Sequence, residues 1–178
     1  MTLEDLLCSH IVDVPDFPTA GVLFKDISPL LGNAEAFRAA VDALVAQHRH
    51  LAVDKVVGIE ARGFLLAAPV AHQLGVGLVP VRKPGKLPRA TYETSYALEY
   101  GTNVLSVHRD AFLPGERVLL LDDVLATGGT AAAAVRLMQE AGAEVVGVSV
   151  LLEIESLPGR ELLAAEHPDL VVRALLTV

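Results

Sequence analysis

The feature that most constrains the fold is an uninterrupted apolar run, Val118 to Leu121, which leads directly into two acids and a glycine turn. Branched residues in succession are typical of a strand that a parallel sheet buries on both faces. The segment after the turn, Thr130 to Ala141, is helical by composition, and Gly142 can end that helix. A buried strand, a tight turn and a helix in this order predict one βα unit of a parallel sheet.

The same alternation continues along the rest of the chain. Asn33 can cap a helix whose apolar positions recur at helical spacing as far as His48. A second helix is expected over residues 63–74, where Pro69 must lie in the first turn or bend the helix. Further strands are expected at residues 53–59, 76–81, 145–152 and 170–176. These units predict an α/β fold around a mainly parallel central sheet flanked by helices, with ligands at the carboxyl ends of its strands.

Length and charge restrict the possible functions. A chain of 178 residues without linkers or repeats predicts a single domain over residues 1–178. The net charge of -8 makes nucleic acid an unfavourable partner, and the longest apolar stretches are too short to span a membrane. The first ten residues lack the features of a secretory signal, and the single cysteine excludes an intrachain disulfide, so a cytoplasmic location is expected.

One segment departs from the alternation. Residues 82–101 are polar and rich in turn formers, with Pro84, Gly85 and Pro88 close together. Long loops in compact domains are usually functional, and this favours the interpretation of residues 82–101 as a mobile lid that covers an active site. An idle surface loop is the alternative.

The turn after the central strand has the chemistry of a ribose phosphate site. Backbone amides around Thr127, Gly128, Gly129 and Thr130 can cradle a phosphate at the start of the helix, and the threonine hydroxyls add donors. Asp122 and Asp123 would repel a phosphate but can accept hydrogen bonds from sugar hydroxyls. The alternative is an ordinary strand-to-helix turn with two solvated acids. The chain has neither a Walker A loop nor a dinucleotide-binding glycine motif.

The stretch VLLLDDVLATGGT resembles the motif with which type I phosphoribosyltransferases bind phosphoribosyl diphosphate (PRPP). The resemblance implies the fold of that family, with a small N-terminal hood of about residues 1–32 over the base and a flexible lid at residues 82–101. It implies that Asp122 and Asp123 hold the ribose hydroxyls, and that the 5-phosphate lies on Ala126, Thr127, Gly128, Gly129 and Thr130. It also implies Mg²⁺, held mainly by PRPP and water rather than by direct protein ligands.

Most of the remaining chain resembles the adenine-specific branch of this family, with matching segments at residues 15–31, 58–64, 81–88, 96–101 and 151–163. The resemblance implies that adenine and PRPP react to give AMP and diphosphate, and that the enzyme is a homodimer. Diphosphate would be bound by Glu60, Ala61 and Arg62, in a loop that often has a cis peptide between its first two residues, and by Arg82, Lys83 and Lys86 of the lid. Surface salt bridges and solubility are the alternative roles for these cations.

For the base, the resemblance implies that backbone groups of Leu23 and Lys25 read the edge of adenine while Phe24 and Leu125 sandwich its ring. Glu99 would face N7 of the base and, with Arg62, form the catalytic pair. Phe24 as plain core and Glu99 as a solvated acid are the alternatives.

Two other functions stay open at this point. One is a phosphoribosyltransferase for a different base, although this chain lacks a lysine after Lys86 that could bind a 6-oxopurine oxygen. The other is a non-catalytic PRPP sensor, for which the segment before Pro15 is too short to be a DNA-binding domain.

Overall fold

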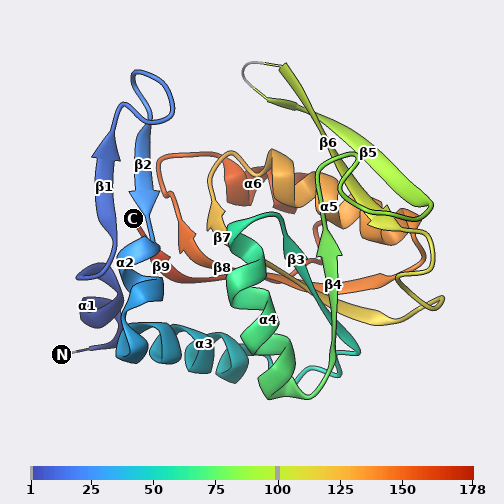
Figure 1. Ribbon diagram of the computed structural model, residues 1–178, viewed down its shortest axis with the longest axis horizontal. Helices are drawn as coiled ribbons and strands as arrows, with labels where there is room; N and C mark the ends of the chain where they lie inside the picture. The colour runs from blue at the N-terminus through green and yellow to red at the C-terminus, as the bar shows by residue number, and fades with distance from the viewer. Residues whose placement is uncertain (1, 99–100) are drawn as a thin grey trace.

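The computed structural model describes residues 2–98 and 101–178, in which a five-stranded parallel sheet lies between two layers of helices and two hairpins form separate two-stranded sheets (Figure 1). Along the chain the elements are α1 (Leu3–Cys8), β1 (Val12–Pro15), β2 (Leu23–Asp26), α2 (Ser28–Gly32), α3 (Ala34–His48), β3 (Lys55–Ile59), α4 (Arg62–Leu74), β4 (Gly77–Val81), β5 (Thr91–Leu98), β6 (Gly101–His108), β7 (Arg117–Leu125), α5 (Gly129–Glu140), β8 (Glu144–Glu153), α6 (Gly159–Glu166) and β9 (Val172–Thr177). Within these described ranges no helix is both long and apolar enough to cross a bilayer.

The order of strands in the central sheet is β4-β3-β7-β8-β9, and every neighbouring pair is parallel. The chain therefore steps from β3 outward to β4, and later returns to the other side of β3 as β7. Between β3 and β7 the direction of winding reverses. In open α/β sheets, ligands bind in the crevice outside the carboxyl ends of the strands at such a point.

Two apolar cores hold the helices on opposite faces of the sheet. Helices α1 to α4 pack on one face, where Leu44 of α3 and Leu66 of α4 meet Leu119 of β7. Helices α5 and α6 and the β5–β6 hairpin pack on the other face, where an alanine run in α5, residues 131–134, is buried. Small side chains let α5 approach β7 closely, which fixes the position of the helix that begins at Gly129.

The elements expected in the central sheet are confirmed within one or two residues, except that β7 continues past Leu121 to Leu125 and so contains both acids. The Asn33 cap is also confirmed, because its Oδ1 accepts hydrogen bonds from the N–H groups of Glu35 and Ala36 at 3.0 Å each. Pro69 lies in the interior of α4 rather than in its first turn.

The expectation of an irregular loop over residues 82–101 is wrong in its second half. Residues 91–98 are strand β5, which pairs with β6 in an antiparallel hairpin. Tyr92, Thr94 and Tyr96 point inward at a period of two, whereas Glu93 and Ser95 are exposed, which is the alternation of a half-buried strand. The polar composition and the nearby turn formers obscure that alternation in the sequence.

The N-terminal hairpin lies at the opposite side of the molecule from the β5–β6 hairpin (Figure 1). Strand β1 pairs with β2 in antiparallel register, from Val12 against Asp26 to Pro15 against Leu23. This hairpin, α1 and α2 make up the segment expected to be the hood, and neither strand is evident from the sequence pattern.

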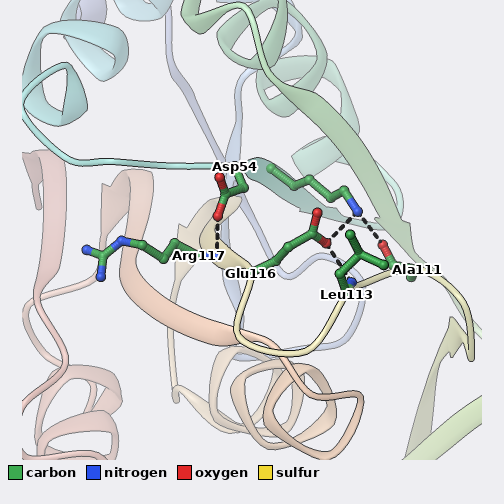
Figure 2. A network of polar contacts seen from close by, with 6 residues as sticks. Asp54, Ala111, Leu113, Glu116 and Arg117 are labelled. Atoms are coloured by element: carbon green, nitrogen blue, oxygen red, sulfur yellow. Dashed lines mark hydrogen bonds and ion pairs between the residues drawn. The ribbon is translucent and has the colours of Figure 1, made fainter.

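A polar network joins the amino ends of β3 and β7, away from the carboxyl ends (Figure 2). Lys55 Nζ donates to Glu116 Oε2 at 2.6 Å and to the carbonyl oxygen of Ala111 at 2.9 Å. The same carboxylate oxygen accepts from the N–H of Leu113 at 2.8 Å. These contacts fix the turn that precedes β7 and leave the other end of the strand free to carry the site.

Candidate active site

A cleft of about 700 Å³ opens at the carboxyl ends of β3 and β7, where the strand order predicts a ligand. Its walls come from β2 of the hood, the start of α4, the end of β7 with the following turn, and the segment after β8. The predicted residues that line it are Leu23, Phe24, Lys25, Glu60, Ala61, Arg62, Lys83, Asp122, Asp123, Leu125, Ala126, Thr127, Gly128 and Thr130. The fold therefore brings most of the residues expected to bind the sugar, the phosphates and the base into one cavity.

The two acids of β7 differ in their surroundings. Asp123 is buried, and its Oδ2 lies 2.8 Å from Nε of Arg62, an ion pair whose atoms are not aligned as a hydrogen bond. Asp122 Oδ1 accepts a hydrogen bond from the N–H of Asp123 at 2.9 Å. Burial raises the pKa of Asp122 well above its ordinary value, and the adjacent charge of Asp123 raises it further. One of the two acids is therefore paired with a cation, and the other holds a proton more readily than a free aspartate.

Gly63, in the first turn of α4, is what allows this arrangement. A Cβ at that position would lie 2.9 Å from Asp122 Oδ1 and 3.0 Å from the carbonyl oxygen of Leu121. Any larger residue would push α4 away from β7 and move Arg62 with it. The sequence pattern places Gly63 only at the start of an expected helix, so this packing role is a finding of the structure.

The turn expected to bind the 5-phosphate, residues 126–130, is called the phosphate turn. It is positioned by close backbone packing. Gly128 has φ of +84°, in the left-handed region that favours glycine, and it precedes the first turn of α5. A Cβ on Gly128 would also lie 2.7 Å from the carbonyl oxygen of Gly159. Glycine is thus required here both for the backbone conformation and for contact with the start of α6, a second reason that the TGGT pattern alone does not reveal.

Tyr96 reaches the same turn from the β5–β6 hairpin. Its hydroxyl lies 3.1 Å from Thr130 Oγ1, and the side chain is almost completely buried. The hairpin is therefore tied to the phosphate turn by a polar contact as well as by the apolar core that contains Leu105 and Val107. Tyr96 lies in a segment expected to be a loop, which is why sequence reasoning does not identify it as a site residue.

The loop after β3 is held by a network around Glu60, and the expected cis peptide between Glu60 and Ala61 is present. The Glu60 carboxylate accepts from the N–H of Lys83 at 3.0 Å and from Arg82 Nε at 3.2 Å. These contacts, led by the Lys83 N–H, lower the pKa of Glu60. Arg82 Nη1 also donates to the carbonyl oxygen of Lys86 at 3.0 Å. Of the three expected lid cations, Lys83 lines the cleft, whereas Arg82 and Lys86 are held beside it.

On the hood side, Arg62 packs over an aromatic ring. Its guanidinium carbon lies 4.6 Å from the centroid of Phe24, a cation–π contact. The ring of Phe17 packs against the Phe24 ring in a T-shaped arrangement at a centroid distance of 5.1 Å. Lys25 Nζ pairs with Asp13 across the hairpin at 2.7 Å. Arg62 thus spans the cleft from Asp123 to Phe24, and one of its nitrogens, Nη1, is buried without a hydrogen-bond partner among the described residues.

The acids in the cleft suit a metal ion that substrate and water largely coordinate. Among residues 2–98 and 101–178 no group of three or more His, Cys, Asp or Glu side chains could hold a metal. Mg²⁺ keeps several waters and is commonly bound through one or two carboxylates plus substrate phosphates. Asp122 and Asp123 fit that pattern, because they offer two carboxylates beside the phosphate turn. Glu99, expected to face the base, lies outside the described residues.

The fold and the cleft define a phosphoribosyltransferase, and residues 31–169 match the phosphoribosyl transferase domain. An adenine phosphoribosyltransferase of Acidothermus cellulolyticus is 59% identical over 176 residues, which cover 99% of this chain and 97% of that protein. The crystal structure of adenine phosphoribosyltransferase from Rhodothermus marinus has a TM-score of 0.92 at 49% identity, covering 99% of this chain and 98% of that one. The Saccharomyces cerevisiae adenine phosphoribosyltransferase, solved with adenine and an imino-altritol bisphosphate, has a TM-score of 0.89 at 34% identity, with 98% of each chain covered.

This chain belongs to the adenine phosphoribosyltransferase family. The expected α/β fold of the type I phosphoribosyltransferases is confirmed as well.

Proposed function

We propose that the chain transfers the 5-phosphoribosyl group of PRPP to N9 of adenine, forming AMP and releasing diphosphate, as a step of purine salvage. The observation that carries the proposal is the meeting of the Asp122–Asp123 pair, the phosphate turn and Arg62 at one switch point of the sheet, in a chain that is 59% identical to an adenine phosphoribosyltransferase.

Each part of PRPP has a complementary group in the cleft. The 5-phosphate would lie on the backbone amides from Ala126 to Thr130, at the start of α5, where the helix dipole favours an anion. Asp122 and Asp123 would accept hydrogen bonds from the ribose hydroxyls. The diphosphate would face Arg62, whose planar guanidinium can bind two phosphate oxygens at once, and Lys83 on the other wall.

Adenine would lie between Phe24 and Leu125, with backbone groups of Leu23 and Lys25 reading its edge. The Lys25 ammonium is already paired with Asp13, which agrees with a backbone role for this residue. Adenine presents a 6-amino donor beside an N1 acceptor, and 6-oxopurines present the reverse. Backbone groups that pair with the edge of adenine would be left buried and unpaired when a 6-oxopurine enters, and this selects adenine.

The position of Arg62 supports an order of binding in which PRPP precedes adenine. Without ligand, its guanidinium covers one face of the Phe24 ring and pairs with Asp123. Diphosphate would draw the guanidinium away from that ring, because a doubly hydrogen-bonded phosphate is a stronger partner than an aromatic face. The face that Arg62 leaves then becomes available to the base.

In the reaction, adenine N9 forms a bond to C1′ as the C1′–O bond to diphosphate breaks with inversion. Bound Mg²⁺ would neutralise charge on the departing diphosphate. Arg62 would stabilise the same charge, and we propose that Glu99 accepts from N7 the proton that adenine loses as N9 forms its bond. Residues 82–101 would act as the lid that excludes water, with movement confined to parts outside the packed base of the β5–β6 hairpin.

We also propose that residues 1–178 act as one domain with residues 1–32 as its hood, that the enzyme is a cytoplasmic homodimer, and that Arg82 and Lys86 join the diphosphate site when the lid closes. Light scattering of the purified protein tests the dimer: a monomer mass at micromolar concentration would contradict it.

The deciding experiment is a diphosphate-release assay with PRPP, Mg²⁺ and a panel of bases. Adenine should be used better than hypoxanthine or guanine by roughly 10⁴-fold in kcat/KM, because the reversed donor and acceptor pattern leaves buried groups unpaired. Comparable turnover of hypoxanthine would refute the base assignment. Binding of PRPP without turnover of any base would instead favour the sensor.

A further inference from the structure

The phosphate turn is supported by Gly159, a residue that is not among those described as lining the cleft. The backbone of Gly159 packs so closely against the turn that a Cβ at this position would collide with the carbonyl oxygen of Ala126. Gly128 touches the same residue from the other direction, since its own Cβ would lie 2.7 Å from the Gly159 carbonyl oxygen. The position of the turn therefore depends on where α6 begins.

The start of α6 has few other attachments. The helix has eight residues, and Pro158 at its N-cap makes no side-chain capping hydrogen bond. Isolated helices of this length are unstable, so tertiary contacts must fix the helix in place. At its first turn Leu162 packs against the apolar core, and Arg160 makes the polar contacts.

Arg160 joins α6 to two strands of the central sheet. Its Nε donates to Glu153 Oε1 at 2.7 Å, and its Nη2 pairs with the other oxygen of the same carboxylate. Its Nη1 donates to the carbonyl oxygen of Val172, at the start of β9, at 2.9 Å. Glu153 is the last residue of β8 and only 7% exposed, so the carboxylate is a fixed anchor rather than a mobile surface group. A two-pronged guanidinium contact of this kind restrains orientation as well as distance.

The anchor is adjacent to the site but outside it. Glu153 pairs in register with Leu125, the residue immediately before the phosphate turn. Neither Glu153 nor Arg160 is among the described residues that line the cleft. Arg160 therefore acts on a ligand only through the position of Gly159 and the turn that packs on it.

We propose that Arg160 is a positioning residue for the 5-phosphate site: its fork on Glu153 fixes the start of α6, and the Gly159 backbone then holds the Ala126–Gly128 turn in its phosphate-binding shape. This inference rests on the proposed function, since it assigns the 5-phosphate to that turn. It predicts an effect on ligands that carry the 5-phosphate and none on the base.

The test is Arg160→Gln, which keeps a polar side chain but loses the fork, the paired contact of Nε and Nη2 with the two Glu153 oxygens. Calorimetric titration with ribose 5-phosphate should show a Kd raised about tenfold, because a displaced turn weakens its backbone contacts with the phosphate. In steady-state assays KM for PRPP should rise by a similar factor while KM for adenine stays within about twofold, because the hood is untouched. A merely structural role would lower the melting temperature of the variant but would not raise KM for PRPP relative to KM for adenine.

Arg117→Gln is the matched control. Arg117 also binds one carboxylate and one backbone carbonyl, with Nη1 at 2.8 Å from Glu144 Oε1 and Nε at 2.7 Å from the Ala52 oxygen, but at the amino ends of the strands. Its ribose 5-phosphate Kd should equal that of the wild type.

If Arg160→Gln does not fold, the double variant Glu153→Gln/Arg160→Gln leaves no unpaired buried charge, and Arg160→Lys keeps a charge without the fork. A wild-type Kd for ribose 5-phosphate in any folded variant of this set overturns the proposal. Failure of the wild-type protein itself to bind PRPP would instead overturn the proposed function.

Discussion

His48 should make the stability of the fold depend on pH in the mildly acidic range. The side chain lies on α3 and is 1% exposed, and neither ring nitrogen has a hydrogen-bond partner among the described residues. Burial lowers the pKa of His48 from 6.5 to about 4, and the positive charges of Arg173 and His50 act in the same direction. The folded protein therefore keeps His48 neutral at pH values where the unfolded chain protonates it.

The sign and the size of the effect follow from linkage. Because the folded state binds fewer protons, stability is unaffected above the unfolded pKa of 6.5 and falls as the pH drops toward the folded pKa of about 4. For these two pKa values the loss between about pH 7.5 and about pH 5 is roughly 2 kcal/mol, a large part of the stability of a small domain.

Urea unfolding of wild type and His48→Leu at a series of pH values measures this term as a difference, so that carboxylates common to both proteins cancel. His48→Leu should gain about 2 kcal/mol relative to wild type on going from about pH 7.5 to about pH 5. His72→Leu changes an exposed histidine of α4 and should follow the wild-type curve. Parallel pH curves for wild type and His48→Leu would refute the reasoning, and would mean that the folded protein pairs or hydrates the imidazole.

Three predictions concern the site. Gly128→Ala should lower the free energy of unfolding in urea by about 1 to 3 kcal/mol and weaken PRPP binding in calorimetry, because alanine is strained at this φ and its Cβ meets Gly159. If both values are unchanged, the phosphate-binding turn lies elsewhere. Tyr96→Phe should raise KM for PRPP about 2- to 10-fold in the wild-type background, because it removes the hydrogen bond between the Tyr96 and Thr130 hydroxyls. In a Thr130→Ala background it should have no such effect, and equal effects in both backgrounds would show that the two residues are not coupled. Glu99→Gln should lower kcat about 10²-fold with PRPP affinity unchanged, and near-normal turnover would assign Glu99 to lid structure.

The central sheet could be predicted because its signals are local. A buried parallel strand is apolar throughout, so runs such as Val118 to Leu121 identify it without knowledge of its neighbours. The two hairpins could not be predicted in the same way. Strand β2 is half exposed and carries Lys25 and Asp26, and β5 alternates polar residues with tyrosines, so each is stabilised by its partner strand and by packing rather than by its own composition.

The site residues likewise divide into those with a local sequence signal and those that depend on contacts between distant parts of the chain. Residues with a proposed chemical function in a contiguous motif, such as Asp123 and Thr127, can be proposed from the sequence because charge, hydroxyl and glycine content are visible there. Gly159 and Arg160 come from a different part of the chain, and their importance depends on a backbone contact with the turn that only the fold creates. Residue type alone would assign Arg160 to an ordinary surface ion pair.

The charges in the cleft would allow two adjacent acids to share the proposed site with phosphates. Asp123 is balanced by Arg62 at 2.8 Å, and burial together with that neighbour raises the pKa of Asp122, so the pair presents less negative charge than two free carboxylates would. If Arg62 moves to the diphosphate, Asp123 loses its cation and the ribose hydroxyls become its available donors. Binding of the diphosphate and binding of the sugar would then support each other, since the cation that one requires is the cation that the other must release. A substrate that carries both groups can make this exchange, whereas ribose 5-phosphate alone leaves Arg62 on Asp123.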